Sequence, residues 1–191
     1  MDEQKATIPP LPIPSPKSLR FPFDDYTVNG LGFLQEATYV GVYWGFHLAE
    51  DILRPANTPI VSIGRGRVVY SALHPGSATK GNWGNLIVIA HKHPKTKQIF
   101  YALYEHMQER LIQKDNLVKK GQVIGSVGKK NTTENGWWDI EHLHFGIYTG
   151  EWHGQVLPGY WTPGSTRTKK EDWVKPSEFI AQFSPSKEIQ K

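Results

Sequence analysis

Cysteine is absent from this 191-residue chain, and no apolar run is long. Without cysteine there is no disulfide, no thiolate nucleophile and no sulfur ligand, so a bound metal would need histidines and carboxylates. The longest apolar run, residues 86–90, is far shorter than the about 18 residues that cross a membrane, so we expect no membrane span. The first residues are acidic and no apolar segment follows them, so we expect no signal peptide in this chain.

Clusters of one charge are also rare. The net charge is +4, with 22 lysines and arginines against 18 aspartates and glutamates. A mildly basic surface favours anionic partners, but the basic residues are scattered as single residues and pairs. We therefore expect no nucleic-acid partner. We also expect a monomer.

Helix signals are few, whereas short apolar runs separated by glycine are frequent. The chain has 18 glycines and 14 prolines, which indicates many turns. A two-residue alternation predicts a strand at residues 142–148, and further strands are expected at residues 59–63, 67–70, 85–91 and 98–104. The predicted fold is a compact, antiparallel all-β domain with few short helices.

Composition divides the chain into three parts. Residues 1–20 include a run of prolines that suits an extended arm or linker. Residues 21–150 hold the predicted strands and form the main domain. Residues 151–191 are rich in aromatic side chains and are expected to pack on that domain, with a short helix near residues 176–183 in which Pro176 suits the first turn.

His142 and His144 stand two residues apart on a predicted strand. Both imidazoles therefore project from the same face, with Cα atoms about 6.6 Å apart. That spacing allows one zinc shared by both rings, and equally one ligand beside one acid/base group. His91 and His93 have the same spacing, but Pro94 ends that strand and no carboxylate is near in sequence. We interpret this second pair as structural or solvent-facing.

His47 and Asp51 offer a nitrogen and an oxygen ligand four residues apart, and His106 lies at the end of a predicted strand. Each of these features alone is more typical of surface or packed residues than of a site. A catalytic zinc needs three protein ligands and an open position for water. His47, Asp51 and one further histidine would complete that set.

The order of these features resembles the M23 metallopeptidases of the lysostaphin and LytM kind. The resemblance covers about residues 40–150, and its matching segments are residues 45–51, 84–91, 104–107, 118–125 and 142–145. It implies a LytM-like fold, which is related to the barrel-sandwich hybrid. It also implies a zinc endopeptidase that hydrolyses peptide bonds in peptidoglycan outside the cytoplasm, in the periplasm, at the cell wall or after secretion.

Carried over residue by residue, the resemblance makes His47, Asp51 and His144 the zinc ligands. His106 and His142 then become the catalytic pair that moves protons and stabilises the oxyanion. The chemistry agrees with this division, because zinc lowers the pKa of bound water toward about 7. Imidazoles with an ordinary pKa of about 6.5 are suited to accept and return a proton at that pH.

The chain departs from the family pattern at residues 129–141, a segment longer than the usual loop, which carries Trp137 and Trp138. The segment is polar and poorly suited to burial, and peptides and saccharides often pack on aromatic faces. We therefore predict that Trp137 and Trp138 bind substrate.

Two other functions fit parts of the sequence. A non-catalytic LytM-like domain that binds cell wall or activates another hydrolase would share the fold. Such domains typically lack one or more of the five site residues, whereas this chain keeps all of them. A biotinyl- or lipoyl-type carrier would explain residues 118–125, but no lysine lies in a recognisable modification turn and the histidines would be unexplained. No motif indicates which peptide bond is cut.

Overall fold

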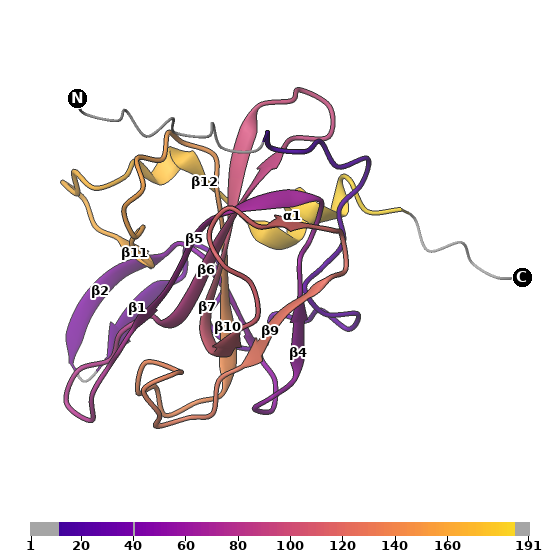
Figure 1. Cartoon of the computed structure of the whole chain (residues 1–191). Coiled ribbons are helices and arrows are strands. Elements are labelled where there is room, and N and C mark those ends of the chain that lie inside the picture. Colours follow the sequence, from indigo (N-terminus) through magenta and orange to yellow (C-terminus); the bar gives the residue numbers. More distant parts are fainter. Residues whose placement is uncertain (1–11, 40, 186–191) are drawn as a thin grey trace, which may run out of the picture.

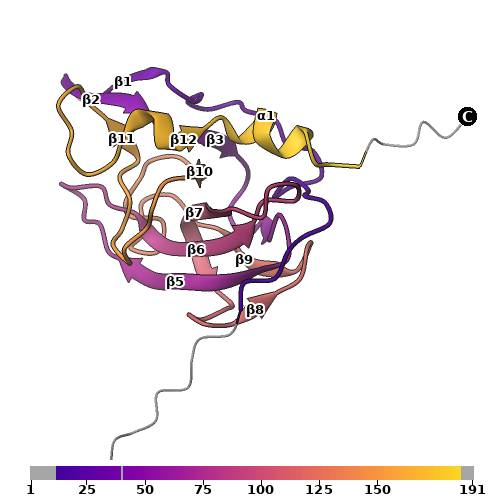
Figure 2. The same cartoon turned by 90° about the horizontal axis from the view of Figure 1, so that it is seen from above.

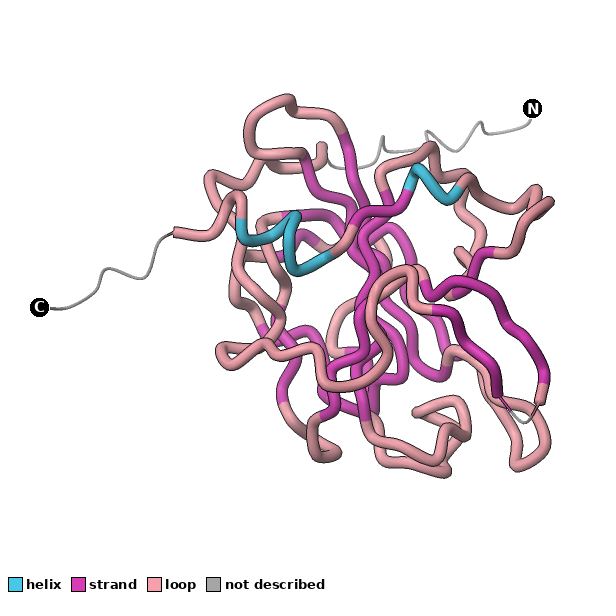
Figure 3. The backbone as a smooth tube through the Cα atoms, turned by 180° about the vertical axis from the view of Figure 1, so that it is seen from behind, coloured by secondary structure: helices cyan, strands magenta, loops and turns pink. Residues whose placement is uncertain are grey.

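The computed structural model describes residues 12–39 and 41–185, which consist mainly of antiparallel strands and loops (Figure 1). Helix in these residues is confined to a 3₁₀ turn at Lys170–Asp172 and to α1 at Pro176–Ala181 (Figure 3). The expected all-β, antiparallel fold is therefore confirmed. Within the same residues, no helix is long and apolar enough to span a membrane.

A large sheet of nine strands forms the body of the protein. Its main path is β12–β10–β7–β6–β5–β8, with the bounds Trp173–Val174, His142–Tyr148, Ile99–Arg110, Gly84–Lys92, Gly66–His74 and Leu117–Val118. Three more strands join this path: β3 (Glu50–Leu53) pairs with β10, and β9 (Val123–Val127) pairs with both β7 and β4 (Pro59–Val61). The strand that carries two of the site histidines, β10, therefore lies inside the sheet and not at its edge.

A small sheet of three strands stands beside the large one. It contains the hairpin of β1 (Glu36–Tyr39) and β2 (Val42–His47), together with β11 (Tyr160–Trp161). At Gly45, where φ is +107°, a Cβ atom would lie 2.3 Å from the carbonyl oxygen of Trp161. Glycine is therefore needed for β2 to approach β11 this closely.

Apolar side chains fill both sides of the large sheet. Along β6, Ile87 and Ile89 belong to one buried cluster, whereas Leu86 and Val88 belong to another. Alternate residues of a strand face opposite sides, so β6 reads as a continuous apolar run because both of its faces are covered. Seen from above, α1, β11 and β12 lie with β1 and β2 on the side of the molecule away from β5 and β6 (Figure 2).

The segments before and after the main strands also contribute to the core. Residues 12–20 have no regular secondary structure, yet Leu19 is fully buried and its backbone N–H donates to the Phe183 carbonyl at 3.0 Å. The earlier part of the predicted arm, residues 1–11, lies outside the described residues. In the C-terminal segment, Leu157 and Trp173 are buried in the second apolar cluster.

Candidate metal centre and active site

The three expected zinc ligands come from two different sheets. His47 is the last residue of β2, in the small sheet, and Asp51 lies on β3, in the large sheet. Asp51 is the direct cross-strand partner of His144 in the antiparallel pair of β3 and β10. Residues opposite each other in such a pair project from the same face. The chain crosses from the small sheet to the large one at residues 48–49, and this crossing brings His47 close to Asp51 and His144.

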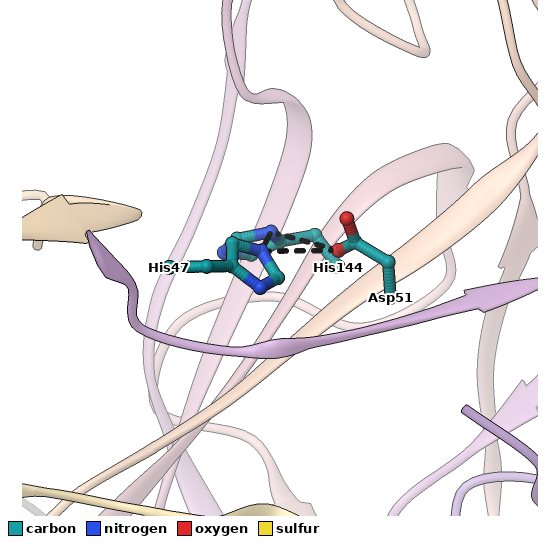
Figure 4. A group of neighbouring side chains, drawn as sticks. All are labelled: His47, Asp51 and His144. Carbon is teal, nitrogen blue, oxygen red and sulfur yellow. Dashed lines mark hydrogen bonds and ion pairs between the residues drawn. The ribbon is translucent and has the colours of Figure 1, made fainter. Parts of the chain in front are cut away.

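Three side-chain atoms converge at this point (Figure 4). His47 Nε2 lies 3.0 Å from His144 Nδ1, and Asp51 Oδ1 lies 3.1 Å from His144 Nδ1 and 3.3 Å from His47 Nε2. Tetrahedral zinc with bonds of about 2.0–2.1 Å separates its ligand atoms by about 3.3 Å. The observed triangle therefore matches the ligand spacing of a zinc ion without rearrangement of the side chains.

The hydrogen bonds around the triangle also fit a cation. His47 Nδ1 lies 3.1 Å from the Gly32 carbonyl, which can only accept, so Nδ1 carries the proton and Nε2 presents a lone pair. That lone pair faces a carboxylate oxygen and a second imidazole nitrogen, both of which are metal-ligating atoms. All three side chains are at most 6% exposed, so solvent screens little of the repulsion between their ligating atoms.

Burial and charge set the protonation states of the triangle. Burial acts to raise the pKa of Asp51, but hydrogen bonds and charge from His144 and His47 hold that pKa well below its usual range. Burial lowers the pKa of His144 to about 4, against an opposing effect of Asp51. Near neutral pH the aspartate is therefore ionised and His144 is neutral, which are the states that bind metal.

His106 lies within β7 and not at the end of a strand, because β7 continues to Arg110. Its φ of +62° and the register shift opposite Asn85–Ile87 mark a β-bulge. A bulge re-aims side chains and is common beside active sites. Here it lets the consecutive residues Glu105 and His106 both approach His144.

His106 and His142 form a pair of rings with centroids 4.7 Å apart. His106 Nδ1 donates to the Asn135 carbonyl at 3.1 Å, and His142 Nδ1 donates to the Ile140 carbonyl at 3.3 Å. Each Nε2 is thereby left as the basic nitrogen. Burial lowers the pKa of both rings, and in His106 the neighbouring histidines lower it further.

A cavity of about 400 Å³ gives access to this centre. Asp51, His106, His142 and His144 line it together with Trp138. The Trp138 indole N–H donates to the Asn82 carbonyl at 2.9 Å, and its ring lies 5.5 Å from that of His106. Trp137, the other tryptophan expected to bind substrate, is half-buried and is not among the cavity's lining residues.

Four aromatic side chains form one wall of the cavity: Tyr39, Trp44, Trp138 and Tyr160. Trp44 contacts Trp138 edge-on at 5.4 Å and Tyr160 at 5.2 Å, and Tyr39 contacts Trp138 at 5.7 Å. A second cavity of about 270 Å³ shares Trp44, Trp138 and Tyr160. This aromatic wall therefore joins the small sheet to the loop at residues 129–141 and separates two cavities.

Sequence reasoning missed several residues of this site. Tyr39, Trp44 and Trp83 were not singled out, and Tyr160 was expected only to pack over the sheet. They come from segments far apart in the chain, and no spacing in the sequence links them. Glu105, buried beside His144, was also missed, although its place directly before His106 was a signal.

The second His-x-His pair lies elsewhere. His91 is fully buried, donates from Nδ1 to the Arg65 carbonyl at 2.9 Å and stacks on Phe100. His93 packs against Phe179 and Phe183. Neither histidine belongs to a group of potential metal ligands among the described residues.

Known protein sequences resemble this chain. The sequence model of peptidase family M23 matches residues 45–158. Murein hydrolase activator NlpD of Salmonella dublin is 33% identical over 133 residues, which are 69% of this chain and 29% of that protein. Peptidoglycan DD-endopeptidase ShyB of Vibrio cholerae is 30% identical over 101 residues, which are 53% of this chain and 20% of that protein. This chain therefore spans less than a third of either relative.

Solved structures show the same fold. A zinc-containing peptidase from Vibrio cholerae is 27% identical with a TM-score of 0.53, covering 69% of this chain and 37% of that chain. The catalytic domain of the antimicrobial peptidase lysostaphin from Staphylococcus simulans has a TM-score of 0.53 at 20% identity, covering 80% of this chain and 90% of that chain. The M23 family model covers more than half of the residues of this protein, so this chain belongs to peptidase family M23.

Proposed function

We propose that this protein is a zinc metalloendopeptidase that hydrolyses peptide bonds in the peptides of peptidoglycan. The observation that carries the proposal is the triangle of His47 Nε2, Asp51 Oδ1 and His144 Nδ1, with the paired rings of His106 and His142 beside it. A zinc ion held by the triangle would supply Lewis acidity and a bound water with a pKa near about 7. Two neutral histidines and one aspartate leave such a centre with a net positive charge.

The catalytic pair has the states that this reaction needs. Since Nδ1 of His106 and of His142 donates to a backbone carbonyl, Nε2 of each ring is free to accept a proton from the attacking water. The proton can then pass to the leaving amine. A protonated Nε2 also donates to the oxyanion that forms on the carbonyl. The lowered pKa of each ring keeps it near pH 7 in the neutral form, in which Nε2 can accept a proton.

The cavity supports a peptide substrate. Trp138 offers an aromatic face next to His106, which suits packing against a peptide or a saccharide. We propose Trp138 as a substrate-binding residue, whereas contact between Trp137 and substrate stays a prediction. Relatives named for action on peptidoglycan or murein favour cell-wall peptides and a place outside the cytoplasm.

A second function, activation of another cell-wall hydrolase, is favoured by the relatives that are named murein hydrolase activators. The presence of all five site residues in one centre favours the enzyme. The two functions separate in one experiment, in which purified zinc-loaded protein is incubated with peptidoglycan, alone and together with a cell-wall amidase. Mass spectrometry then identifies the soluble products.

A peptidase releases peptide fragments by itself, loses this ability with a chelator and regains it with added zinc. An activator releases nothing alone and increases only the products of the amidase. His106→Ala is the matched control, since it should abolish peptide release by a peptidase while leaving the surface needed for activation. Absence of new peptide ends in the zinc-loaded protein alone would refute the peptidase.

A further inference from the structure

Glu105 continues the row of site residues across the large sheet. In the pairing of β10 with β7, Glu105 is the direct cross-strand partner of His144, just as Asp51 is its partner on the other side. Asp51, His144 and Glu105 therefore form one row across β3, β10 and β7. Directly opposed residues share a face, so both carboxylates flank the same imidazole. Glu105 is 1% exposed.

Burial of the Glu105 carboxylate destabilises the folded protein unless a positive charge lies near it. Glu105 Oε2 is buried and has no hydrogen-bond partner within the described part of the chain. A buried, unsatisfied carboxylate destabilises a fold. No cationic side chain of Lys or Arg forms an ion pair with Glu105 among the described residues.

The polar atom beside the Glu105 carboxylate is the outer ring nitrogen of His144, Nε2. Glu105 Oε2 lies 3.6 Å from His144 Nε2, just beyond hydrogen-bonding distance, while His144 Nδ1 points at His47 and Asp51. If Nδ1 binds a metal, Nε2 must carry the proton, which then points toward the carboxylate. Histidines that bind metals commonly donate their other ring N–H to a carboxylate, and this contact orients the ring and increases its basicity.

We propose that Glu105 is a positioning residue of the metal centre, which accepts the Nε2–H of His144 and thereby strengthens zinc binding. The contact fixes the tautomer in which Nδ1 faces the metal. It also adds a second negative charge to that of Asp51, so the centre with zinc becomes close to neutral. The β-bulge at His106 makes this arrangement compatible with catalysis, because it lets Glu105 and His106 approach the site from consecutive positions.

The proposal rests on the metal site of the proposed function and not on peptide hydrolysis. A competing arrangement exists, because ligand atoms of Glu105, His106 and His144 also lie within 4.8 Å of one another and could hold a metal themselves. If this group and the triangle each held a metal, His144 would have to use both ring nitrogens as ligands. The number of zinc ions per chain separates these arrangements.

The test compares the zinc affinity of the full chain in four forms: wild type, Glu105→Met, Glu105→Gln and Glu109→Gln. Affinity is measured by competition with a chromophoric chelator at fixed pH, and thermal unfolding is measured without metal. Glu109 is an exposed glutamate on the same strand and serves as the matched control. We expect Glu105→Met to weaken zinc binding by about 10- to 100-fold. Glu105→Gln should recover part of this loss, because its amide oxygen still accepts the Nε2–H, and Glu109→Gln should match the wild type.

The metal-free proteins should show the opposite trend. Removal of an unsatisfied buried carboxylate leaves the melting temperature of metal-free Glu105→Met equal to or above that of the wild type. If Glu105 had a purely structural role, Glu105→Met would instead lower the melting temperature of the metal-free protein. Equal zinc affinity of Glu105→Met and wild type, or a second zinc that only the wild type binds, would overturn the proposal. A wild type that binds no zinc would refute the metal site itself along with it.

Discussion

Glu50, next to the proposed metal ligand Asp51, is expected to stabilise the fold and not to take part in chemistry. It is 1% exposed, and its carboxylate accepts three hydrogen bonds. The donors are the Tyr26 hydroxyl at 2.7 Å, the Ser177 N–H at 2.9 Å and the Ser177 hydroxyl at 2.6 Å. Tyr26 precedes the strands and Ser177 lies in α1, so Glu50 attaches both flanking segments to β3.

The substitution Glu50→Gln keeps the shape of the side chain and removes its charge. Hydrogen bonds to a charged group contribute about 1.5–3 kcal/mol and neutral ones about 0.5–1.5 kcal/mol, so weakening three of them costs about 3 kcal/mol. At about 2–4 °C per kcal/mol for a chain of this size, the melting temperature should fall by about 6–12 °C. Zinc content should not change, because the pairing of β3 with β10 still holds Asp51.

Thermal unfolding of Glu50→Gln, followed by metal analysis of the folded protein, checks this expectation. Glu178→Gln is the matched control, since Glu178 is an exposed residue of α1 whose ion pair with Lys175 should contribute little. A melting temperature of Glu50→Gln equal to that of the control would show that the charge of Glu50 does not stabilise the fold. Loss of zinc without loss of stability would instead give Glu50 a role in the metal site.

Three further predictions concern the site and its surroundings. His106→Ala and His142→Ala should each retain zinc and lose about 10²- to 10⁴-fold in the rate of peptide release; loss of zinc in His142→Ala would make that residue a ligand. Trp138→Ala should weaken turnover of peptidoglycan while costing less than the about 3–5 kcal/mol of a fully buried tryptophan; a large loss of stability with unchanged kinetics would place Trp138 in the core. Burial lowers the pKa of His91 in the folded chain to about 4, whereas its pKa in the unfolded chain is about 6.5. Between these two pH values the unfolded chain binds a proton at His91 and the folded chain does not. Stability is therefore lost as pH falls from about 6.5 to about 4, and in urea titrations the advantage of wild type over His91→Gln should shrink by up to about 3 kcal/mol in that window; an advantage that does not vary with pH would contradict this.

Much of the fold follows from local patterns in the sequence. The two-residue alternation at residues 142–148 predicts a strand with the bounds that β10 has. The apolar runs bounded by glycine predict further strands around it, such as β6 and β7. Such patterns report which face of a strand is apolar, and that is sufficient for an all-β assignment.

The site residues were predicted from motifs and not from geometry. His47, Asp51 and His144 meet because β3 pairs with β10 in one particular register and β2 ends over that point. Local spacing does not determine the register of strands that are far apart in the chain. The spacing of His142 and His144 left open a shared zinc, whereas the structure directs only His144 to the triangle and pairs His142 with His106.

The remaining features depend on contacts that only the folded chain creates. The position of Glu105 beside His144 requires the register of β10 with β7 and the positive φ of His106, and neither has a sequence signature. The aromatic wall collects side chains from β1, β2, β11 and the loop at residues 129–141. Each of these aromatics, taken alone, is more typical of packing than of a binding site.

A zinc titration of the metal-free protein, with peptide release from peptidoglycan as the readout, tests most directly whether this protein is a zinc peptidase. We expect no release of peptides without metal, a rise in proportion to added zinc, and saturation at one zinc per chain. The His144→Ala variant should neither bind zinc at this stoichiometry nor release peptides. Full activity in the metal-free protein, or a wild type that binds one zinc per chain and releases no peptide, would contradict the proposed function.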